Sequence, residues 1–363
     1  MKKYFSVAIL LFISILSFQS CNEDVNLVGE FEETAIVYGL LDVSDSVHMI
    51  KITRAYITPG SSSIADSNYF DNVAATVKEY VNGNLQRSWA LSDTIIDNKD
   101  PNGIFYAPEQ KVYYFQTPPS SPLLGNATYK LHIDVNNGEF EVTAETEIVT
   151  GMSCTASTQN FSFRFADNPS AYRTTALDVG TGNAYQVNTT LVTNYRDWIG
   201  ANYTDRSFSW QLGESAVNPN STKTFTASGE TFFNLMRSSC SAGSPSVTKR
   251  WFLSFDVLVT GGSEELYNYI SVNKPNSSLA QSKPTYTNLT ATNGHDVIGI
   301  FSSRQTLRFN KPFYISPAQA YIRALDKKST QELCQGAICG PYLFCSTHPG
   351  DNVIGNPEPY ACN

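Results

Sequence analysis

The chain has 363 residues, a formal net charge of −8 and 41% hydrophobic residues. This length predicts two domains, and the hydrophobic fraction is sufficient for real cores. The acidic balance, with no run of five or more basic residues, argues against nucleic acid and anionic lipid surfaces as partners. Only 16% of the residues are charged while Tyr and Phe are abundant, which is typical of an exported β protein with aromatic side chains on pleated sheets.

Residues 1–20 predict a secretory signal peptide. Lys2 and Lys3 form a positive start, an apolar run follows at residues 5–18, and the small residue Ser20 stands before the cleavage point. The apolar run is shorter than the stretch of about 20 residues that a transmembrane helix needs. We therefore expect this segment to be removed from the mature chain.

Cleavage after residue 20 makes Cys21 the first residue of the mature chain. A cysteine there resembles the bacterial lipoprotein box, in which the thiol receives a diacylglycerol and the new amine receives a third acyl chain. Phe18 and Gln19 stand where the box usually has Leu and a small residue. Because two or more acyl chains hold a protein firmly on a membrane, we predict a lipid anchor at Cys21 and a tether over residues 21–33. The alternative is a plain signal peptide with Cys21 in a disulfide.

Residues 34–149 predict a β-sandwich domain. A near-continuous apolar run at 34–42 is typical of a buried strand, and residues 48–57 alternate between apolar and polar side chains. Asn-Gly pairs at 82–83 and 137–138 lie between apolar runs, and this pair is the strongest local signal of a hairpin. Strands of this length with closely spaced turns predict an immunoglobulin-like or prealbumin-like sandwich.

Residues 150–310 predict a second β-rich domain that contains a few short helices. The helix candidates are 229–238, with apolar side chains on one face, and 263–273, which begins with a serine N-cap and two acids in the first turn. A strong strand or pair of strands follows at 297–309, and a further short helix is predicted at 317–328.

The last segment, residues 311–363, predicts a cysteine-rich tail stapled by disulfides. Besides the lipid site the chain has six cysteines, Cys154, Cys240, Cys334, Cys339, Cys345 and Cys362. The last four of these lie in the final 30 residues. An even number in an exported chain indicates up to three disulfides, in 15 possible connectivities, and by elimination Cys154 would pair with Cys240. Zinc is the alternative, but the tail has no C-x2-C pair and His348 is its lone histidine.

The segment NKDPNGIFYAPE, residues 98–109, matches the calcium-loop template with one substitution. Asn98, Asp100 and Asn102 would supply oxygen ligands at positions one, three and five, and Glu109 would bind through both carboxylate oxygens. Asn98 replaces the first Asp of the template, and the flanks are predicted strands instead of helices. The alternative to this calcium site is a hairpin loop that needs the same residue types for its turn geometry. No other cofactor is predicted.

Motifs of catalysis are not found in the sequence. It contains no H-E-x-x-H, no G-x-S-x-G, no P-loop and no dinucleotide fingerprint, and only four histidines. Glu264 and Glu265 form a carboxylate pair, but two acids at the start of a helix have an ordinary explanation in the helix dipole. The sequence therefore predicts a protein that is not an enzyme.

Aromatic residues in or near loops of the second domain offer a binding hypothesis. These residues are Trp198, Tyr203, Trp210, Tyr267 and Tyr269. Exposed rings can stack on sugars or hold apolar peptides. The alternative is that most of these rings are core, since 12% of the chain is aromatic.

The order of these features resembles a known family. The lipoprotein box, AIVYGLLD…HMIKITRAY at 35–56, the sandwich, PTYTNLTATNGHDVIGIFSSR at 284–304 and the cysteine-bearing end resemble Bacteroidetes surface lipoproteins that carry only a domain-of-unknown-function label. Similar proteins are often encoded beside TonB-dependent outer-membrane transporters with a carboxypeptidase-regulatory-like plug extension. The family has no established catalytic residues to carry over.

The resemblance implies two further sets of residues. In that lineage, acids directly after the lipid cysteine resemble a signal for export to the cell surface, and Glu23 and Asp24 occupy these positions. The triplets DSV and DTI resemble the lineage's O-glycosylation sites, with Ser46 and Thr94 as acceptors.

The expected function is therefore that of a non-enzymatic lipoprotein, held on the outer membrane by its N-terminal lipid and facing the cell exterior. It would bind a ligand or partner, as an accessory to a TonB-dependent transporter. The alternatives are a surface adhesin or glycan-binding module and, in third place, a hydrolase whose site has no linear motif.

Overall fold

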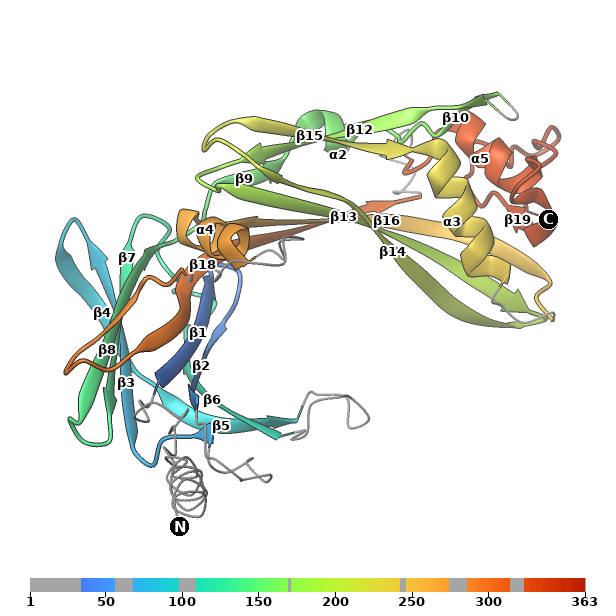
Figure 1. The fold of residues 1–363 in the computed structure, drawn as a ribbon. Coiled ribbons are helices and arrows are strands. Elements are labelled where there is room, and N and C mark those ends of the chain that lie inside the picture. Colours follow the sequence, from blue (N-terminus) through green and yellow to red (C-terminus); the bar gives the residue numbers. More distant parts are fainter. Residues whose placement is uncertain are drawn as a thin grey trace, which may run out of the picture.

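The computed structural model describes residues 34–55, 68–97, 109–168, 171–241, 246–273, 286–313 and 323–362. The fold is mainly β, with several sheets and a few short helices, as predicted (Figure 1). Its largest sheet has nine strands in the order β14-β13-β16-β18-β1-β2-β6-β5, with β19 beside β16. These strands are β1 (Thr34–Asp42), β2 (Val47–Ala55), β5 (Ser92–Asp97), β6 (Glu109–Gln116), β13 (Gln186–Ile199), β14 (Asn202–Ala216), β16 (Lys249–Gly262), β18 (Val297–Pro312) and β19 (Phe344–Cys345).

The predicted N-terminal sandwich is confirmed. A five-stranded sheet in the order β17-β8-β7-β3-β4 faces the half of the large sheet that contains β1, β2 and β6. Side chains of both sheets, among them Val37, Ile50, Tyr129, Phe140 and Phe301, share one buried core. The strands of the smaller sheet are β3 (Val73–Val81), β4 (Asn84–Ala90), β7 (Thr128–Val135), β8 (Phe140–Glu147) and β17 (Leu289–Ala291).

Both predicted Asn-Gly hairpin turns are present in this sandwich. Asn82 and Gly83 connect β3 to β4 with φ of 49° and 77°, and Asn137 and Gly138 lie between β7 and β8 with φ of 59° and 91°. Positive φ is what a tight hairpin requires, and Asn and Gly reach it at low cost. The local sequence therefore sets where these two hairpins turn, although a bulge between Glu79 and Tyr80 shifts the register of β3 against β4 further along.

Strand β18 belongs to both halves of the molecule. Its first part pairs in parallel with β1, from Val297 to Arg304, and its second part pairs antiparallel with β16, from Arg304 to Pro312. The segment 289–304, which the sequence division placed in the second domain, thus adds β17 and half of β18 to the first sandwich. Gly299 permits this contact, because a Cβ on it would lie 2.0 Å from the carbonyl oxygen of Val37.

The second body is built on β13, β14, β16 and the far half of β18. A three-stranded sheet, β15-β12-β9, and helix α3 cover it, and the pair β10-β11 lies at its edge (Figure 1). Its core is rich in stacked aromatics, such as Phe165, Phe232 and Phe255. The remaining strands are β9 (Met152–Cys154), β10 (Ala166–Asn168), β11 (Ala171–Tyr172), β12 (Thr174–Thr181) and β15 (Thr222–Ser228).

The two central helix predictions are confirmed, whereas the described part of the predicted helix 317–328 is not helical before Lys327. The helices are α2 (Ala156–Asn160), α3 (Gly229–Ser241), α4 (Glu264–Asn273), α5 (Lys327–Gln335) and the 3-10 turn η3 (Gly340–Tyr342). Asp326 is the N-cap of α5, where its carboxylate accepts from the backbone N–H of Ser329. Residues 323–326, inside the segment predicted as helix, precede α5 because this cap starts the helix after them.

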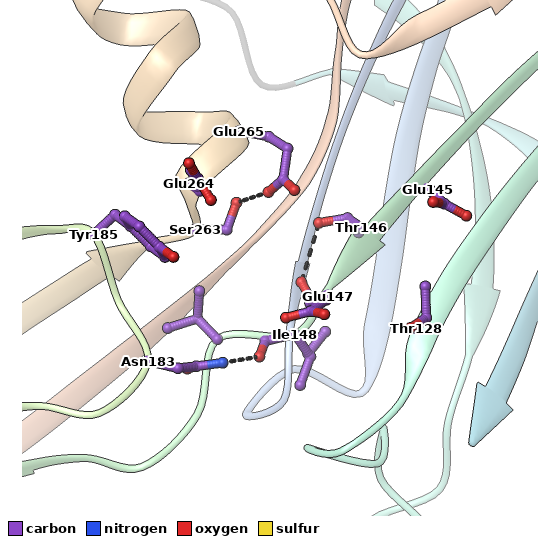
Figure 2. A pocket seen from close by; sticks show the side chains of 11 residues that line it. Thr128, Glu145, Thr146, Glu147, Ile148, Asn183, Tyr185, Ser263, Glu264 and Glu265 are labelled. Atoms are coloured by element: carbon purple, nitrogen blue, oxygen red, sulfur yellow. Dashed lines mark hydrogen bonds between the residues drawn. The ribbon is translucent and has the colours of Figure 1, made fainter. Parts of the chain in front are cut away.

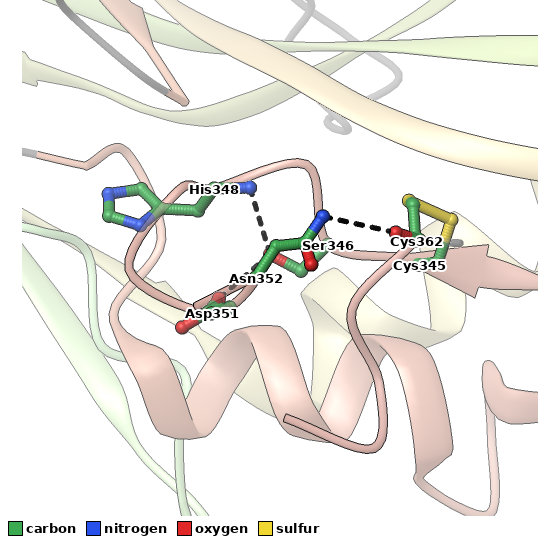
Figure 3. Close-up of a disulfide and its surroundings, with 6 residues drawn as sticks. All are labelled: Cys345, Ser346, His348, Asp351, Asn352 and Cys362. Atoms are coloured by element: carbon green, nitrogen blue, oxygen red, sulfur yellow. Dashed lines mark hydrogen bonds between the residues drawn. A yellow bond between two sulfur atoms is a disulfide. The ribbon is translucent and has the colours of Figure 1, made fainter. Parts of the chain in front are cut away.

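The tail packs against α3 and the start of β16, and a disulfide joins Cys345 to Cys362 (Figures 1 and 3). Buried charges stabilise it: Arg323 donates to both carboxylate oxygens of Asp351 at 3.0 and 2.7 Å, and Ser346 donates to the same group at 2.7 Å. Within the described part of the chain, no helix has the length and apolarity to cross a membrane.

Candidate functional site

The main candidate site is a cavity of about 420 Å3 where the first sandwich meets the second body (Figure 2). The start of β7 and the end of β8 form one wall, and the segment before β13 together with the start of α4 forms the other. The lining residues are Thr128, Glu145, Thr146, Glu147, Ile148, Val149, Asn183, Tyr185, Ser263, Glu264 and Glu265.

Strand β8 supplies two of the four carboxylates in this lining. Its sequence FEVTAETE alternates strictly between buried and exposed side chains. This period of two places Glu145 and Glu147 on the solvent face, while Ala144 and Thr146 point into the sandwich. The two acids therefore share one side of the strand and line the cavity from the first sandwich.

Helix α4 supplies the other two carboxylates. Glu264 and Glu265 are in its first turn, where negative side chains interact favourably with the helix dipole. Ser263, which is buried, precedes the helix and donates from its Oγ to the carboxylate of Glu265. Figure 2 shows Glu264 on the same side as Tyr185, across the cavity from Glu147.

Two buried serines of β18 connect the walls. The hydroxyl of Ser302 lies 2.7 Å from that of Ser263. Ser303 donates from its Oγ to the carbonyl oxygen of Glu147 at 2.6 Å and accepts from the backbone N–H of Val149 at 3.0 Å. Both walls are thereby held by adjacent residues of one strand.

The lining is strongly acidic. Of the described cations, Lys130 alone pairs with one of its carboxylates, reaching Glu145 at 3.0 Å. Glu264 raises the pKa of the Tyr185 phenol, because its negative charge and its acceptor oxygen both favour the protonated hydroxyl. Three carboxylates thus remain without a cationic partner among the residues that the structure describes.

Such an arrangement is suited to a positively charged organic group. Carboxylates form short charge-assisted hydrogen bonds with ammonium and guanidinium groups, and the ring of Tyr185 adds a face that attracts cations. A cavity of this size takes a small ligand or a single protruding side chain. In the described part of the chain, no three His, Cys, Asp or Glu side chains are arranged to hold a metal ion.

A family model, "Domain of unknown function (DUF4249)", matches residues 23–308. The chain belongs to this family. The match includes the sandwich, the second body and every residue of the cavity, and it ends before the cysteine-rich tail. No curated protein matches the DUF4249 chain.

Solved structures include a match to the C-terminal globular domain of an oligosaccharyltransferase from Pyrococcus abyssi. That match has 11% sequence identity, covers 55% of this chain and 40% of the other, and has a TM-score of 0.18. A score this low does not indicate a shared fold, so nothing about this DUF4249 protein follows from it.

Several predicted site residues lie outside the described part of the DUF4249 chain. They are the lipid site Cys21, the export acids Glu23 and Asp24, and the calcium ligands Asn98, Asp100 and Asn102. The fourth calcium ligand, Glu109, is exposed at the start of β6. Of the predicted glycosylation acceptors, Ser46 is exposed in the bend before β2, and Thr94 is half-buried in β5. The calcium and glycosylation sites stay predictions.

The predicted aromatic residues do not gather on one surface. Trp198 and Tyr203 lie at the β13–β14 turn, with ring centroids 5.1 Å apart, and Trp251 adjoins Trp198 at 4.6 Å. Trp210 packs against the second core instead. Tyr267 and Tyr269 are on α4, where the hydroxyl of Tyr269 lies 3.0 Å from that of Tyr38 on β1.

Of the up to three disulfides that the sequence predicted, the structure forms one. Only the pair Cys345–Cys362 is bonded among the described residues, while Cys154, Cys240, Cys334 and Cys339 are buried thiols. The pair inferred by elimination, Cys154 with Cys240, is not formed, because one residue is on β9 and the other at the end of α3. Elimination failed because it assumed that the four tail cysteines pair with one another.

The tail brings Ser, His and Asp side chains close together, but their contacts are structural. Ser346 donates to Asp351, and the imidazole of His348 points away from Ser346 (Figure 3). Although burial alone would raise the pKa of Asp351, hydrogen bonds from Arg323 and Ser346 hold it below its ordinary value. The Asp351 carboxylate thus joins Arg323 and Ser346 within the tail.

Sequence reasoning missed the cavity itself. Its four glutamates come from two segments more than 110 residues apart, and each pair had an ordinary local explanation. The alternation in β8 was the one available signal, since it placed Glu145 and Glu147 on a solvent face.

Proposed function

We propose that the protein is a non-enzymatic lipoprotein of the outer membrane, anchored through Cys21 and facing the cell exterior, that binds a cationic ligand or partner group in its acidic cavity. The observation that carries the binding role is the lining of this cavity, with four carboxylates and one paired cation. The signal-like segment, the lipoprotein box and Glu23 and Asp24 support the location.

The ligand class follows from the chemistry of the lining. A guanidinium or ammonium group can donate to the carboxylates of Glu147 and Glu264, which have no cationic partner among the described residues, while its flat face or methylene stem packs on Tyr185. The cavity volume suits a basic side chain on a partner's loop, or a small basic ligand.

A TonB-dependent transporter of a Bacteroidetes outer membrane is the partner that this proposal names. The lipid tether would confine both proteins to one membrane, and this raises their effective concentration without any new contact. Co-purification in mild detergent tests this part. Recovery of a β-barrel transporter supports it, and repeated recovery of the lipoprotein without one contradicts it.

The binding site is tested with a short arginine-containing peptide, whose citrulline counterpart serves as a neutral probe. In calorimetry at low salt we expect wild-type protein to bind the arginine peptide at least about tenfold more tightly than the citrulline peptide. The double variant Glu147→Gln/Glu264→Gln should lose this preference. The control Asp71→Asn/Glu230→Gln removes two exposed charges elsewhere and should keep it. Equal binding by wild type and the first variant would refute the site.

A glycan-binding role is the second candidate, and the cluster of Trp198, Tyr203 and Trp251 supports it. Arg196 lies 3.7 Å from the ring of Tyr203 and Lys249 lies 5.3 Å from that of Trp251, so the cluster combines rings with positive charge. A glycan array tests this role. Binding that disappears in Tyr203→Ala supports it, while an empty array counts against it.

A further inference from the structure

Three buried thiols lie where α3 meets the tail. Cys240 is in the last turn of α3, Cys334 is in α5, and Cys339 precedes η3; their exposed fractions are 3%, 8% and 1%. All three belong to the second core, and helix α3 packs against η3. The tail lies beside α3 in Figure 1.

The contacts of Cys339 point to α3. Its Sγ donates to the carbonyl oxygen of Phe233 at 3.4 Å. Cys240 follows Phe233 by seven residues, which is two helical turns, so both are on the same face of α3, and both are buried. The carbonyl of Phe233 points along the helix towards its C-terminal end, and therefore towards Cys240.

A second set of contacts places the end of α3 beside η3. The hydroxyl of Tyr195 lies 2.7 Å from that of Ser239, the neighbour of Cys240. Arg250 donates to the carbonyl oxygen of Tyr342 at 2.8 Å, and the N–H of Tyr342 donates to the carbonyl oxygen of Cys339 at 2.9 Å. Strands β13 and β16, which carry Tyr195 and Arg250, are neighbours in the sheet, so these contacts surround one small region.

We propose that Cys240 and Cys339 form a second disulfide in the exported protein, which ties α3 to the cysteine-rich tail and leaves Cys154 and Cys334 as thiols. Cys334 is the less suitable partner, because the groups whose charges act on it are those of the pair Arg323–Asp351, whereas Cys240 acts more strongly than Cys334 on Cys339. The proposal takes the exported location from the proposed function and is independent of ligand binding.

The reaction is thiol–disulfide exchange with an oxidising dithiol–disulfide protein or oxidised glutathione. Each thiol gives up its proton, the two Sγ atoms bond, and two electrons and two protons reduce the oxidant's disulfide to two thiols. Burial raises the pKa of Cys240 to about 11 and raises that of Cys339 as well, so few thiolates exist once the tail has docked. The disulfide therefore forms during folding, and it is slow to form when oxidant is added to folded, reduced protein.

Counting free thiols tests the pairing. The mature chain with Cys21→Ser is refolded with oxidised glutathione, denatured without reductant and labelled with a maleimide, and intact mass gives the number of labels. We expect two labels in the parent, three in Cys240→Ser, three in Cys339→Ser and one in the matched control Cys334→Ser. Reduction should raise the parent to six labels and lower its Tm by on the order of 10 °C.

Other label counts overturn the proposal. Four labels in the parent mean that only Cys345–Cys362 forms, and a single label in Cys240→Ser means that two of Cys154, Cys334 and Cys339 pair with each other. Where a variant fails to fold, peptide mapping of the parent decides, with a protease that cuts between Ala337 and Ile338 to separate Cys334 from Cys339. A peptide that links Cys240 to Cys339 supports the proposal, and any other linkage of either residue refutes it.

Discussion

Replacement of Lys311 by Met is expected to stabilise the protein at neutral pH and to destabilise it at high pH. Lys311 lies near the end of β18 and is 1% exposed, and its Nζ donates to the carbonyl oxygen of Gln159 at 2.8 Å. The rings of Phe163 and Phe309 lie 5.1 and 5.7 Å from the ammonium. Burial lowers the pKa of Lys311 from 10.5 to about 8, because the apolar surroundings disfavour the charged form.

The size of the expected change in unfolding free energy follows from the pKa of Lys311. The difference between 10.5 and about 8 corresponds to about 3 kcal/mol of unfolding free energy below pH 8, at about 1.4 kcal/mol per pKa unit. Methionine keeps the length and the apolar contacts of the lysine stem without this penalty. It leaves the Gln159 carbonyl without its donor, which costs about 1 kcal/mol. The variant should therefore be more stable than wild type by about 2 kcal/mol at pH 7.

The sign of the pH dependence follows from the order of the two pKa values. Between pH 8 and 10.5 the unfolded chain holds a proton on Lys311 that the folded protein has released, so wild-type stability rises with pH in this window. The variant lacks this rise. Near pH 11 the lost hydrogen bond remains as the main difference, and the variant should be less stable by about 1 kcal/mol.

Urea unfolding followed by tryptophan fluorescence, from pH 7 to 11, measures this crossover. Differences between variant and wild type at each pH remove the contributions of the other titrating groups. Lys328→Met, at an exposed position in α5, is the control and should show no crossover. A stability difference between Lys311→Met and wild type that stays constant over this range would refute the assignment of a buried, weakly compensated ammonium.

Three other substitutions have defined outcomes in the same unfolding assay. Glu79→Gln removes a fully buried carboxylate that pairs with Arg87 at 2.6 Å, and should lower the free energy of unfolding by about 3 kcal/mol at pH 7. Although burial alone would raise the pKa of Glu79, hydrogen bonds, first of all from Arg87, lower it, so wild type loses this contribution as pH falls below 4.5. An unchanged acid limb in Glu79→Gln would contradict this. Cys345→Ser opens the 17-residue tail loop and should cost about 3 kcal/mol, with faster hydrogen exchange confined to the tail; exchange that stays slow there argues against a staple. Gly299→Ala places a methyl group against the carbonyl oxygen of Val37 and should cost at least about 2 kcal/mol, so an unchanged urea midpoint would show that β1 and β18 can separate freely.

Local sequence patterns predicted the parts of the fold that short-range chemistry decides. The alternation over residues 48–57 predicted a half-buried strand, and the Asn-Gly pairs predicted two hairpin turns, because side-chain period and backbone φ are properties of a few neighbouring residues. The parallel pairing of β1 with β18 joins residues about 260 positions apart. Neither strand has a sequence feature that identifies its partner. The domain boundary predicted at residue 150 therefore does not follow the strand pairing, which brings residues 289–304 to the first sandwich.

The candidate site escaped prediction for the same reason. Glu145 and Glu147 resemble the solvated face of any strand, and Glu264 and Glu265 resemble the first turn of any helix. Their approach depends on where β18 places the two bodies, and this placement is a long-range property. Cysteine pairing is of the same kind, since the number of cysteines limits how many pairs can form but does not show which of them meet in the fold.

The continuity of β18 also determines what kind of binding the cavity can perform. Ser302 contacts the wall that begins α4, and Ser303, the next residue, holds the wall that ends β8. Because β18 pairs with β1 up to Arg304 and with β16 from Arg304 onward, one continuous strand carries the contacts to both walls. The cavity is therefore preformed, and a cationic group would meet carboxylates that are already in place, so that affinity is not reduced by a closing transition.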